Sequence, residues 1–165
     1  MPTWAAEGER GFGSRLALWL ARGGGAGYVP FAPGTAGSAE GAVLAWLFLY
    51  LGPWGLLAGA AGVSALAVWA TGRAERILGH KDPPELVLDE AAGMCWALVG
   101  APARLGWWWL AAFLLFRGLD SLKPFRRLEA FSGGWGVVGD DVAAGLVTAG
   151  TLWLVRGAWG GEFAL

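Results

Sequence analysis

Five apolar segments, separated by short polar stretches, set the main limit on how this chain can fold. They cover residues 39–51, 54–71, 86–100, 105–119 and 142–155. Several are shorter than the roughly 20 residues that a helix needs to cross a bilayer. Turns at Gly52-Pro53 and at Pro102 fit short helices that pack together and locally thin the membrane. Because no alternating strand pattern occurs, the sequence predicts an all-α, polytopic membrane helical bundle with about five short spans.

The composition favours a membrane protein over a soluble one. Of the 165 residues, 56% are hydrophobic and only 15% are charged, whereas soluble domains have about 25% charged residues. The chain has 12 Trp, which favour the membrane interface, and 29 Gly, which let helices approach closely. A soluble, very apolar helical bundle is the alternative. The net charge of −1 gives no indication of a nucleic-acid partner.

The N-terminal region shows no signal peptide, because its charged residues are not followed directly by an apolar core. Residues 14–21 predict an amphipathic helix that lies on the membrane surface. We therefore expect residues 1–25 to form a cytoplasmic or interfacial segment. The whole chain, 1–165, is predicted to be one membrane-embedded domain.

The distribution of basic residues predicts the orientation. If the N-terminus is cytoplasmic and all five segments cross, ten Lys and Arg residues lie inside and only Arg104 and Arg156 lie outside. This is a strong positive-inside bias. The same arrangement brings residues 31–38, 80–90 and 120–141 to the cytoplasmic ends of the spans. Three polar loops are thus expected to converge on the cytoplasmic face and to form one site.

The first polar stretch is Pro-Gly-Thr-Ala-Gly-Ser, residues 33–38, directly before the first apolar segment. Glycine lets backbone N–H groups approach an anion, and free N–H groups at a helix start favour phosphate. Ser38 is also a suitable N-cap for the following helix. The stretch is either a phosphate-binding loop or a tight turn with a helix cap.

The second stretch places Asp82, Asp89 and Glu90 around the start of the third apolar segment. Carboxylates close to a span are costly and indicate function, and Mg²⁺ prefers carboxylate oxygens. Adjacent helical residues point about 100° apart. Asp89 and Glu90 therefore need a third group, such as Asp82, to enclose one metal ion. The alternative is a favourable interaction of negative charge with a helix N-terminus.

Two further stretches complete the set. Asp120 and Lys123 share a helical face at the end of the fourth segment and can simply form an ion pair. With Arg117 they also suit a phosphate beside a metal ion. Asp140 and Asp141 follow a Gly-rich stretch and open the fifth segment, either as solvated caps or as metal ligands.

In order along the chain, these motifs resemble those of the phosphatidylglycerophosphatase A family. The matching stretches are PGTAGS (33–38), KDPPELVLDE with AGM after one further Ala (81–94), FRGLDSLKP (116–124) and GGWGVVGDDVAAG (133–145). Four ordered motifs are much more specific than any single one. The chain departs from the usual family pattern in the loops before Pro33 and after Pro124, which bears on the lipid fit more than on the chemistry.

The resemblance implies a magnesium-dependent phosphoric monoester hydrolase of the inner membrane, which converts phosphatidylglycerophosphate in the bilayer to phosphatidylglycerol. The expected Mg²⁺ ligands are Asp82, Asp89, Glu90, Asp140 and Asp141. The expected catalytic residues are Asp82, Asp89, Asp120, Arg117 and Lys123. The expected substrate-phosphate contacts are Gly34, Thr35, Gly37, Ser38 and Lys81.

Two other functions compete with this interpretation. Lipid head-group transferases with a gapped Asp motif carry an Ala-Arg pair that is missing between the acidic pairs here. A small transporter or channel would use the carboxylates as an ion site, but such residues are expected at mid-span. For a phosphatase, attack by water is the default, and an aspartyl-phosphate intermediate is the alternative.

Overall fold

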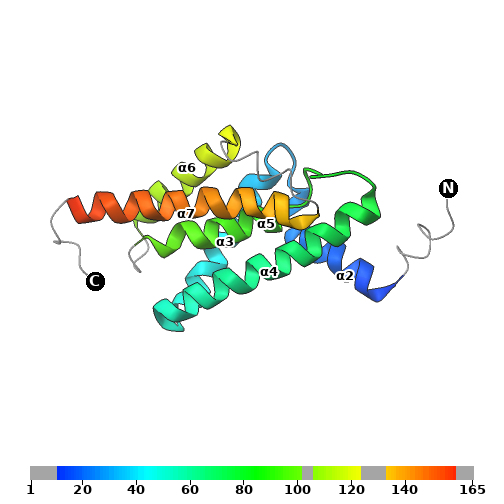
Figure 1. Ribbon diagram of the computed structural model, residues 1–165, viewed down its shortest axis with the longest axis horizontal. Coiled ribbons are helices and arrows are strands. Elements are labelled where there is room, and N and C mark those ends of the chain that lie inside the picture. Colours follow the sequence, from blue (N-terminus) through cyan, green and yellow to red (C-terminus); the bar gives the residue numbers. More distant parts are fainter. Residues whose placement is uncertain (1–10, 102–105, 124–132, 159–165) are drawn as a thin grey trace.

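The computed structural model describes residues 11–101, 106–123 and 133–158, and every regular element in these ranges is helical. The elements are α2 (Phe12–Ala21), the 3₁₀ helix η1 (Gly23–Tyr28), α3 (Pro33–Leu49), α4 (Gly52–Leu78), α5 (Leu88–Val99), α6 (Trp107–Leu122) and α7 (Gly134–Ala158). The long helices α4 and α7 extend along the long axis of the molecule (Figure 1). The prediction of an all-α bundle is confirmed for this part of the chain.

Within the described residues each of the five apolar segments contains a helix, and several of these helices extend beyond the segment into the polar stretches. Helix α3 begins at Pro33 rather than near residue 39, and α7 begins at Gly134 rather than near residue 142. Helix α4 continues to Leu78. Proline is well suited to the first turn of α3, because its missing N–H would have no partner there. The motifs thus lie partly on helices and not only in loops.

Helix α5 is the central helix, and small residues let its neighbours approach it. It makes its most extensive contacts with α3, α4 and α7. A Cβ added at Gly41 would lie 2.8 Å from the Cα of Ala91, and one added at Gly145 would lie 3.0 Å from the carbonyl carbon of Gly93. These distances are at or below the limit that real Cβ atoms show, so glycine sets the helix spacing at both contacts. Close packing of small residues is typical of helices in membranes.

Two described helices, α4 and α7, are long and apolar enough to cross a membrane, with 27 and 25 residues. Many large apolar side chains point outward. On α6, Leu110 and Leu114 are 59% and 62% exposed, and on α7, Trp153 and Leu154 are similarly exposed. Soluble monomers rarely expose contiguous apolar surface of this kind. These outward faces support membrane association.

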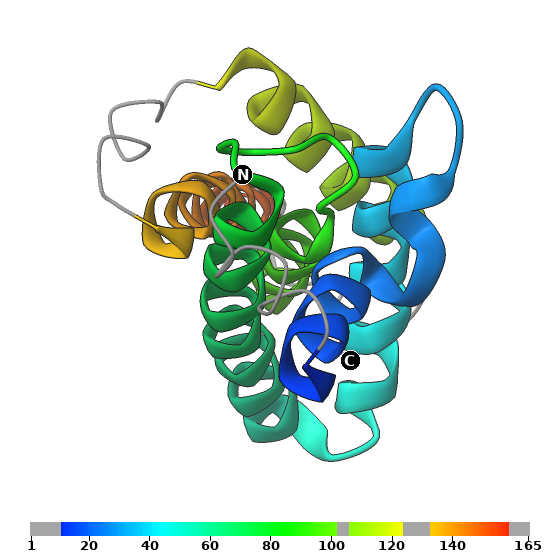
Figure 2. The same cartoon turned by 90° about the vertical axis from the view of Figure 1, so that its right-hand side faces the viewer.

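One end of the bundle collects the polar motifs. The start of α3, the end of α4, the start of α5, the end of α6 and the start of α7 meet there, and Figure 2 looks onto this end. The contacts agree: Gly34 of α3 lies against Glu90 and Arg117, while Gly72 of α4 lies against Gly134 of α7. The expected convergence of three separate motifs is therefore present in the fold.

Candidate functional site

Three carboxylates from two helices form the centre of the site. Ligand-type oxygens of Asp89, Glu90 and Asp141 all lie within 4.8 Å of one another. Asp89 and Asp141 are almost completely buried, with 2% and 6% of their surface exposed. Asp89 and Glu90 occupy the first turn of α5, and Asp141 lies in the second turn of α7.

Glycine at position 93 brings the two helices together. A Cβ added to Gly93 would lie 2.6 Å from the carbonyl oxygen of Asp141 and 2.7 Å from the ring of Phe116. Any larger residue would push α7 away from α5. Since Gly93 is one turn after Asp89 and Glu90, this contact sets the distance at which Asp141 faces them.

Two oxygens of this carboxylate group are buried without a hydrogen-bond partner among the described residues. Oδ1 of Asp89 and Oε2 of Glu90 are buried and accept no hydrogen bond within the described residues. Buried oxygens of this kind need a cation or a proton.

The arrangement fits a hard divalent cation. Carboxylate oxygens are the ligands that Mg²⁺ prefers, and the two buried oxygens without partners are available to it. Glu90 and Asp89 could share one ion because Asp141 supplies the third group. The sequence prediction expected Asp82 in that place, and the described coordinates place Asp141 there instead.

A basic residue borders the carboxylates on the side of α6. Arg117 forms an ion pair with Asp120, one turn later on the same helix, and Asp120 is buried. The sequence had suggested that Asp120 could pair with Lys123; the ion pairs seen in the described residues join Asp120 to Arg117 and Lys123 to Asp82. A Cβ on Gly34 would lie 2.5 Å from Oε1 of Glu90 and 3.2 Å from the Arg117 guanidinium. The start of α3 therefore contacts both the acidic and the basic side of the site.

Lys123 reaches across to a different loop. Its Nζ lies 3.2 Å from Oδ2 of Asp82, and both side chains are more than a third exposed. The backbone N–H of Asp82 donates to Oε1 of Glu75 on α4 at 2.9 Å. Asp82 is thus held beside Lys123 and is not one of the three close carboxylates.

Residues 33–38 differ from the prediction in their local structure. They form the first two turns of α3, whose N-cap is Ala32, so the prediction that Ser38 caps this helix is wrong. The Ser38 hydroxyl is fully buried and donates to the carbonyl oxygen of Gly34 at 2.8 Å. Thr35 is exposed. Gly37 packs against Val87, which explains why a side chain is excluded there.

Two further predicted residues lie near the cluster without belonging to it. Asp140 is buried on α7 next to Asp141, but it is not among the three close carboxylates. Lys81 is exposed in the loop that follows α4. The sequence analysis did not single out Arg76, which lines a pocket together with Lys81. Arg76 follows Glu75 near the end of α4, and no sequence motif marked it as a candidate site residue.

Comparison with known proteins identifies the family. The family pattern described as Phosphatidylglycerophosphatase A matches residues 19–156. A putative phosphatidylinositol-3-phosphatase of Bacteroides thetaiotaomicron is 40% identical over 81% of this chain and 89% of its own length. Two proteins named Phosphatidylglycerophosphatase A are also similar. The one from Escherichia coli is 35% identical over 85% of this chain and 83% of its own length.

The second, from Haemophilus influenzae, is 37% identical over 77% of this chain and 80% of its own length. No solved structure matches. The matched region includes all four motifs and every carboxylate described above. The chain therefore belongs to the phosphatidylglycerophosphatase A family.

Proposed function

We propose that this protein hydrolyses phosphatidylglycerophosphate to phosphatidylglycerol and phosphate, as the names of two relatives and of the family indicate. The observation that carries the proposal is the buried group of Asp89, Glu90 and Asp141 beside Arg117. A phosphate monoester is a dianion, so its hydrolysis needs positive charge on its oxygens and a positioned nucleophile. The site supports both requirements.

Mg²⁺ is the proposed cofactor, held by Asp89, Glu90 and Asp141. A bound divalent cation would neutralise the phosphate dianion and polarise its oxygens. The first-turn position of Asp89 and Glu90 makes these ligands part of the rigid core of α5. Asp140 and Asp82 lie outside the three close carboxylates. We therefore propose that they influence the site as neighbouring carboxylates and not as ligands of this ion.

Arg117 and Lys123 are proposed to bind the phosphoryl oxygens. Arg117 offers a planar set of donors that suits a phosphate, and its pairing with Asp120 holds it at the edge of the site. Lys123 is held in place by Asp82. The start of α3, at Gly34 and Thr35, would present backbone N–H groups to the same phosphate. We propose direct attack by water on phosphorus, in which Asp120 accepts the water proton and passes it to the glycerol oxygen that leaves as its bond to phosphorus breaks.

The protein is proposed to be a multi-pass protein of the inner membrane, with this site on the cytoplasmic side. Helices α4 and α7 are long enough to span. Helices α3 and α6 have 17 and 16 residues, or about 25 Å of length, so they would cross only a thinned bilayer. The end that carries the acidic residues also carries most basic residues, as the positive-inside rule requires.

The distribution of acidic residues disfavours a transport pathway. The sequence has no Asp or Glu at positions 41–74, 91–119 or 142–161. The acidic residues of α4 to α7 therefore all lie toward one end of the bundle. An ion pathway would need polar groups along the length of the spans, whereas a lipid head group needs them only at the interface.

The proposed activity is tested by phosphate release from phosphatidylglycerophosphate by the purified protein in detergent. We expect release with Mg²⁺, none with EDTA, and none with Asp89→Asn. Glu85→Gln is the matched control, because Glu85 pairs with Arg22 and is not one of the three close carboxylates. A folded wild-type sample that releases no phosphate would disprove the substrate assignment. Release that persists with EDTA would disprove the role of the metal.

A further inference from the structure

Phe31 lies between η1 and α3, and its side chain is completely exposed. Its φ angle is 72°, in the left-handed region that bulky residues adopt only at an energetic cost. Packing against the described part of the chain does not offset this cost, because the ring lies outside the bundle. A strained backbone that holds an aromatic ring outside the protein points to a partner that covers the ring.

Phe31 is the tip of an apolar loop, residues 28–31, in which every residue is exposed. The base of this loop is held in place by two contacts. The Arg22 guanidinium lies 5.2 Å from the centre of the Tyr28 ring, and Gly27 packs against the backbone of the segment before α5. Figure 2 shows the loop standing out from the bundle ahead of α3. The 28–31 loop is therefore an anchored apolar projection.

The outward face of α3 continues this apolar surface. Helix α3 begins two residues after Phe31. Val43, Leu47 and Tyr50 recur along it at helical spacing, share one face and are all exposed. Soluble monomers rarely expose an apolar surface that runs from a loop along a whole helix. The outward faces of α6 and α7 support membrane association, so the bilayer is the partner that also covers this surface.

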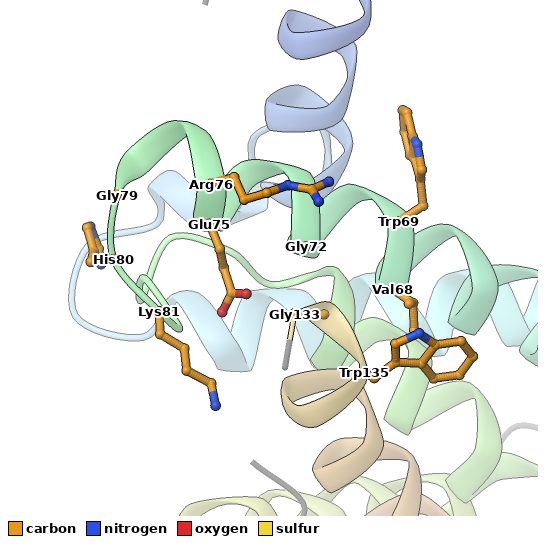
Figure 3. A pocket seen from close by; sticks show the side chains of 11 residues that line it. Val68, Trp69, Gly72, Glu75, Arg76, Gly79, His80, Lys81, Gly133 and Trp135 are labelled. Atoms are coloured by element: carbon orange, nitrogen blue, oxygen red, sulfur yellow. The ribbon is translucent and has the colours of Figure 1, made fainter. Parts of the chain in front are cut away.

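Two indole rings mark the level of the bilayer surface at this end of the bundle. Trp69 on α4 and Trp135 on α7 are both exposed, and both lie close to the contact of Gly72 with Gly134. They are therefore at the same height to within about one helical turn. In Figure 3 the two indoles lie on one side of this contact, and the polar side chains at the end of α4 lie on the other. Indole rings favour the boundary between head groups and acyl chains, so this boundary passes at their level.

The 28–31 loop also lies close to the carboxylate site. Phe31 is three residues before Gly34, so the Cα atoms of these two residues are at most about 11 Å apart. Gly34 in turn lies against both Glu90 and Arg117. A phospholipid whose acyl chains contact Phe31 therefore has its head group beside the site.

We propose that the 28–31 loop inserts Phe31 into the phospholipid leaflet that carries the substrate, at the level of Trp69 and Trp135. The loop holds a phospholipid beside the site, with the acyl chains against the aromatic ring and the head group toward Arg117. Its role in substrate binding rests on the proposed function, whereas its contact with the bilayer does not. Because the loop contacts acyl chains, it distinguishes a lipid in a bilayer from a water-soluble phosphate ester.

The first experiment measures the contact with lipid and needs no turnover. Phe31→Cys and His80→Cys, an exposed loop position at the same end, are each combined with Cys95→Ala and labelled with an environment-sensitive fluorophore. The full-length protein is reconstituted in vesicles of phosphatidylcholine and phosphatidylglycerol. We expect the label of Phe31→Cys to emit at shorter wavelength and to be quenched by nitroxide-labelled lipid. The label of His80→Cys should emit as in water and be quenched by iodide.

Two results of this experiment would overturn the contact with lipid. Quenching by iodide that is as strong at position 31 as at position 80 would show that the loop lies in water. Protection of position 31 from both iodide and nitroxide-labelled lipid would show that protein covers the loop, as in a contact with a second copy of the chain.

The second experiment measures the role of the loop in hydrolysis. Phe31→Gly removes the ring and relieves the strained φ angle, so thermal stability should be retained. We expect KM for long-chain phosphatidylglycerophosphate in vesicles to rise about tenfold, because one large apolar contact is lost. KM for a water-soluble short-chain form should stay unchanged, and Phe31→Trp should keep both wild-type values. Trp54→Ala is the matched control, because Trp54 is an exposed aromatic residue at the opposite end of the bundle.

An unchanged KM for the vesicle substrate in Phe31→Gly would overturn the role of the loop in substrate binding. An equal rise in KM for Trp54→Ala would overturn it as well, since any exposed aromatic residue would then have the same effect. If position 31 contacts lipid but the wild-type protein hydrolyses neither form of the substrate, the proposed function is wrong and the contact with the bilayer stands.

Discussion

Asp82 and Lys123 form an ion pair across 41 residues of sequence, with 3.2 Å between Oδ2 and Nζ. Both residues have positive φ angles, 50° for Asp82 and 44° for Lys123. Non-glycine residues rarely adopt this conformation. Asp82 lies in the loop after α4 and Lys123 is the C-cap of α6, so the pair joins two elements at the edge of the site. Both partners of this contact have an unfavourable backbone conformation. We therefore infer that the pair serves to position the two elements at the edge of the site.

Replacing Lys123 with Gly tests the function of the side chain separately from the strain of its positive φ angle. Glycine adopts a positive φ easily, and a partly exposed ion pair contributes only about 0.5–1 kcal/mol. We therefore expect thermal stability to change little while phosphate release falls at least roughly tenfold. Lys123→Arg should retain more activity than Lys123→Gly. If Lys123→Gly hydrolyses the lipid at the wild-type rate, Lys123 serves only the contact with Asp82.

Replacing Asp89 with a neutral residue should strongly weaken metal binding without destabilising the fold. Its Oδ1 is buried without a hydrogen-bond partner within the described residues, so Asp89→Asn removes charge from a place where charge is costly. We expect unchanged or higher thermal stability without metal and a loss of at least about 100-fold in Mn²⁺ affinity. The measurement is a Mn²⁺ titration followed by electron paramagnetic resonance, with Glu85→Gln as control. Mn²⁺ affinity equal to that of wild type would contradict the proposed ligand set.

Gly34 is expected to be essential for the positions of the Glu90 and Arg117 side chains. An added Cβ would lie 2.5 Å from Glu90 and 3.2 Å from Arg117, so Gly34→Ala must displace one of these side chains. We expect a strong loss of phosphate release with modest loss of stability. Gly118→Ala on α6 is the matched control, because nothing lies within 4 Å of its added Cβ. That control should gain roughly 0.5–1 kcal/mol of helix stability and keep its activity.

Gly145 is expected to be essential for folding. It contacts the backbone of Gly93, and an added Cβ would lie 3.1 Å from the Cβ of Trp96. Gly145→Val should separate α5 from α7 and destabilise the protein by roughly 1–3 kcal/mol through overpacking. Thermal unfolding in detergent measures this effect. Gly150→Ala, on the same helix but with open space around it, should unfold near the wild-type temperature. Similar unfolding temperatures for both variants would show that the α5–α7 contact is looser than described.

The orientation can be tested with single cysteines. Cys95 is buried and is the only cysteine, so Cys95→Ala gives a clean background. Pro84→Cys lies at the site end and Tyr50→Cys at the opposite end, and both positions are exposed. In intact cells, an impermeant thiol reagent should label position 50 and spare position 84. The opposite labelling pattern would place the site outside the cytoplasm.

Much of this architecture follows from the sequence alone. The five apolar segments predicted the helices, because a chain with so few charges must bury its backbone polar groups in helices when it enters lipid. The four motifs identified the family and predicted that Asp89, Glu90 and Asp141 belong to one site. The positive-inside bias gave a specific orientation to test. These features are local in the chain, so the order of residues is enough to reveal them.

The tertiary structure decided which carboxylates meet. The sequence suggested Asp82 as the third group beside Asp89 and Glu90 and gave Asp141 only as a further metal ligand, because it does not say how closely α5 and α7 approach. That distance depends on the contact of Gly93 and Gly145 across two helices. Helix α7 also begins at Gly134, ahead of the predicted segment, where Gly72 accommodates it. Long-range packing therefore determined the composition of the site, while the local pattern determined only its candidates.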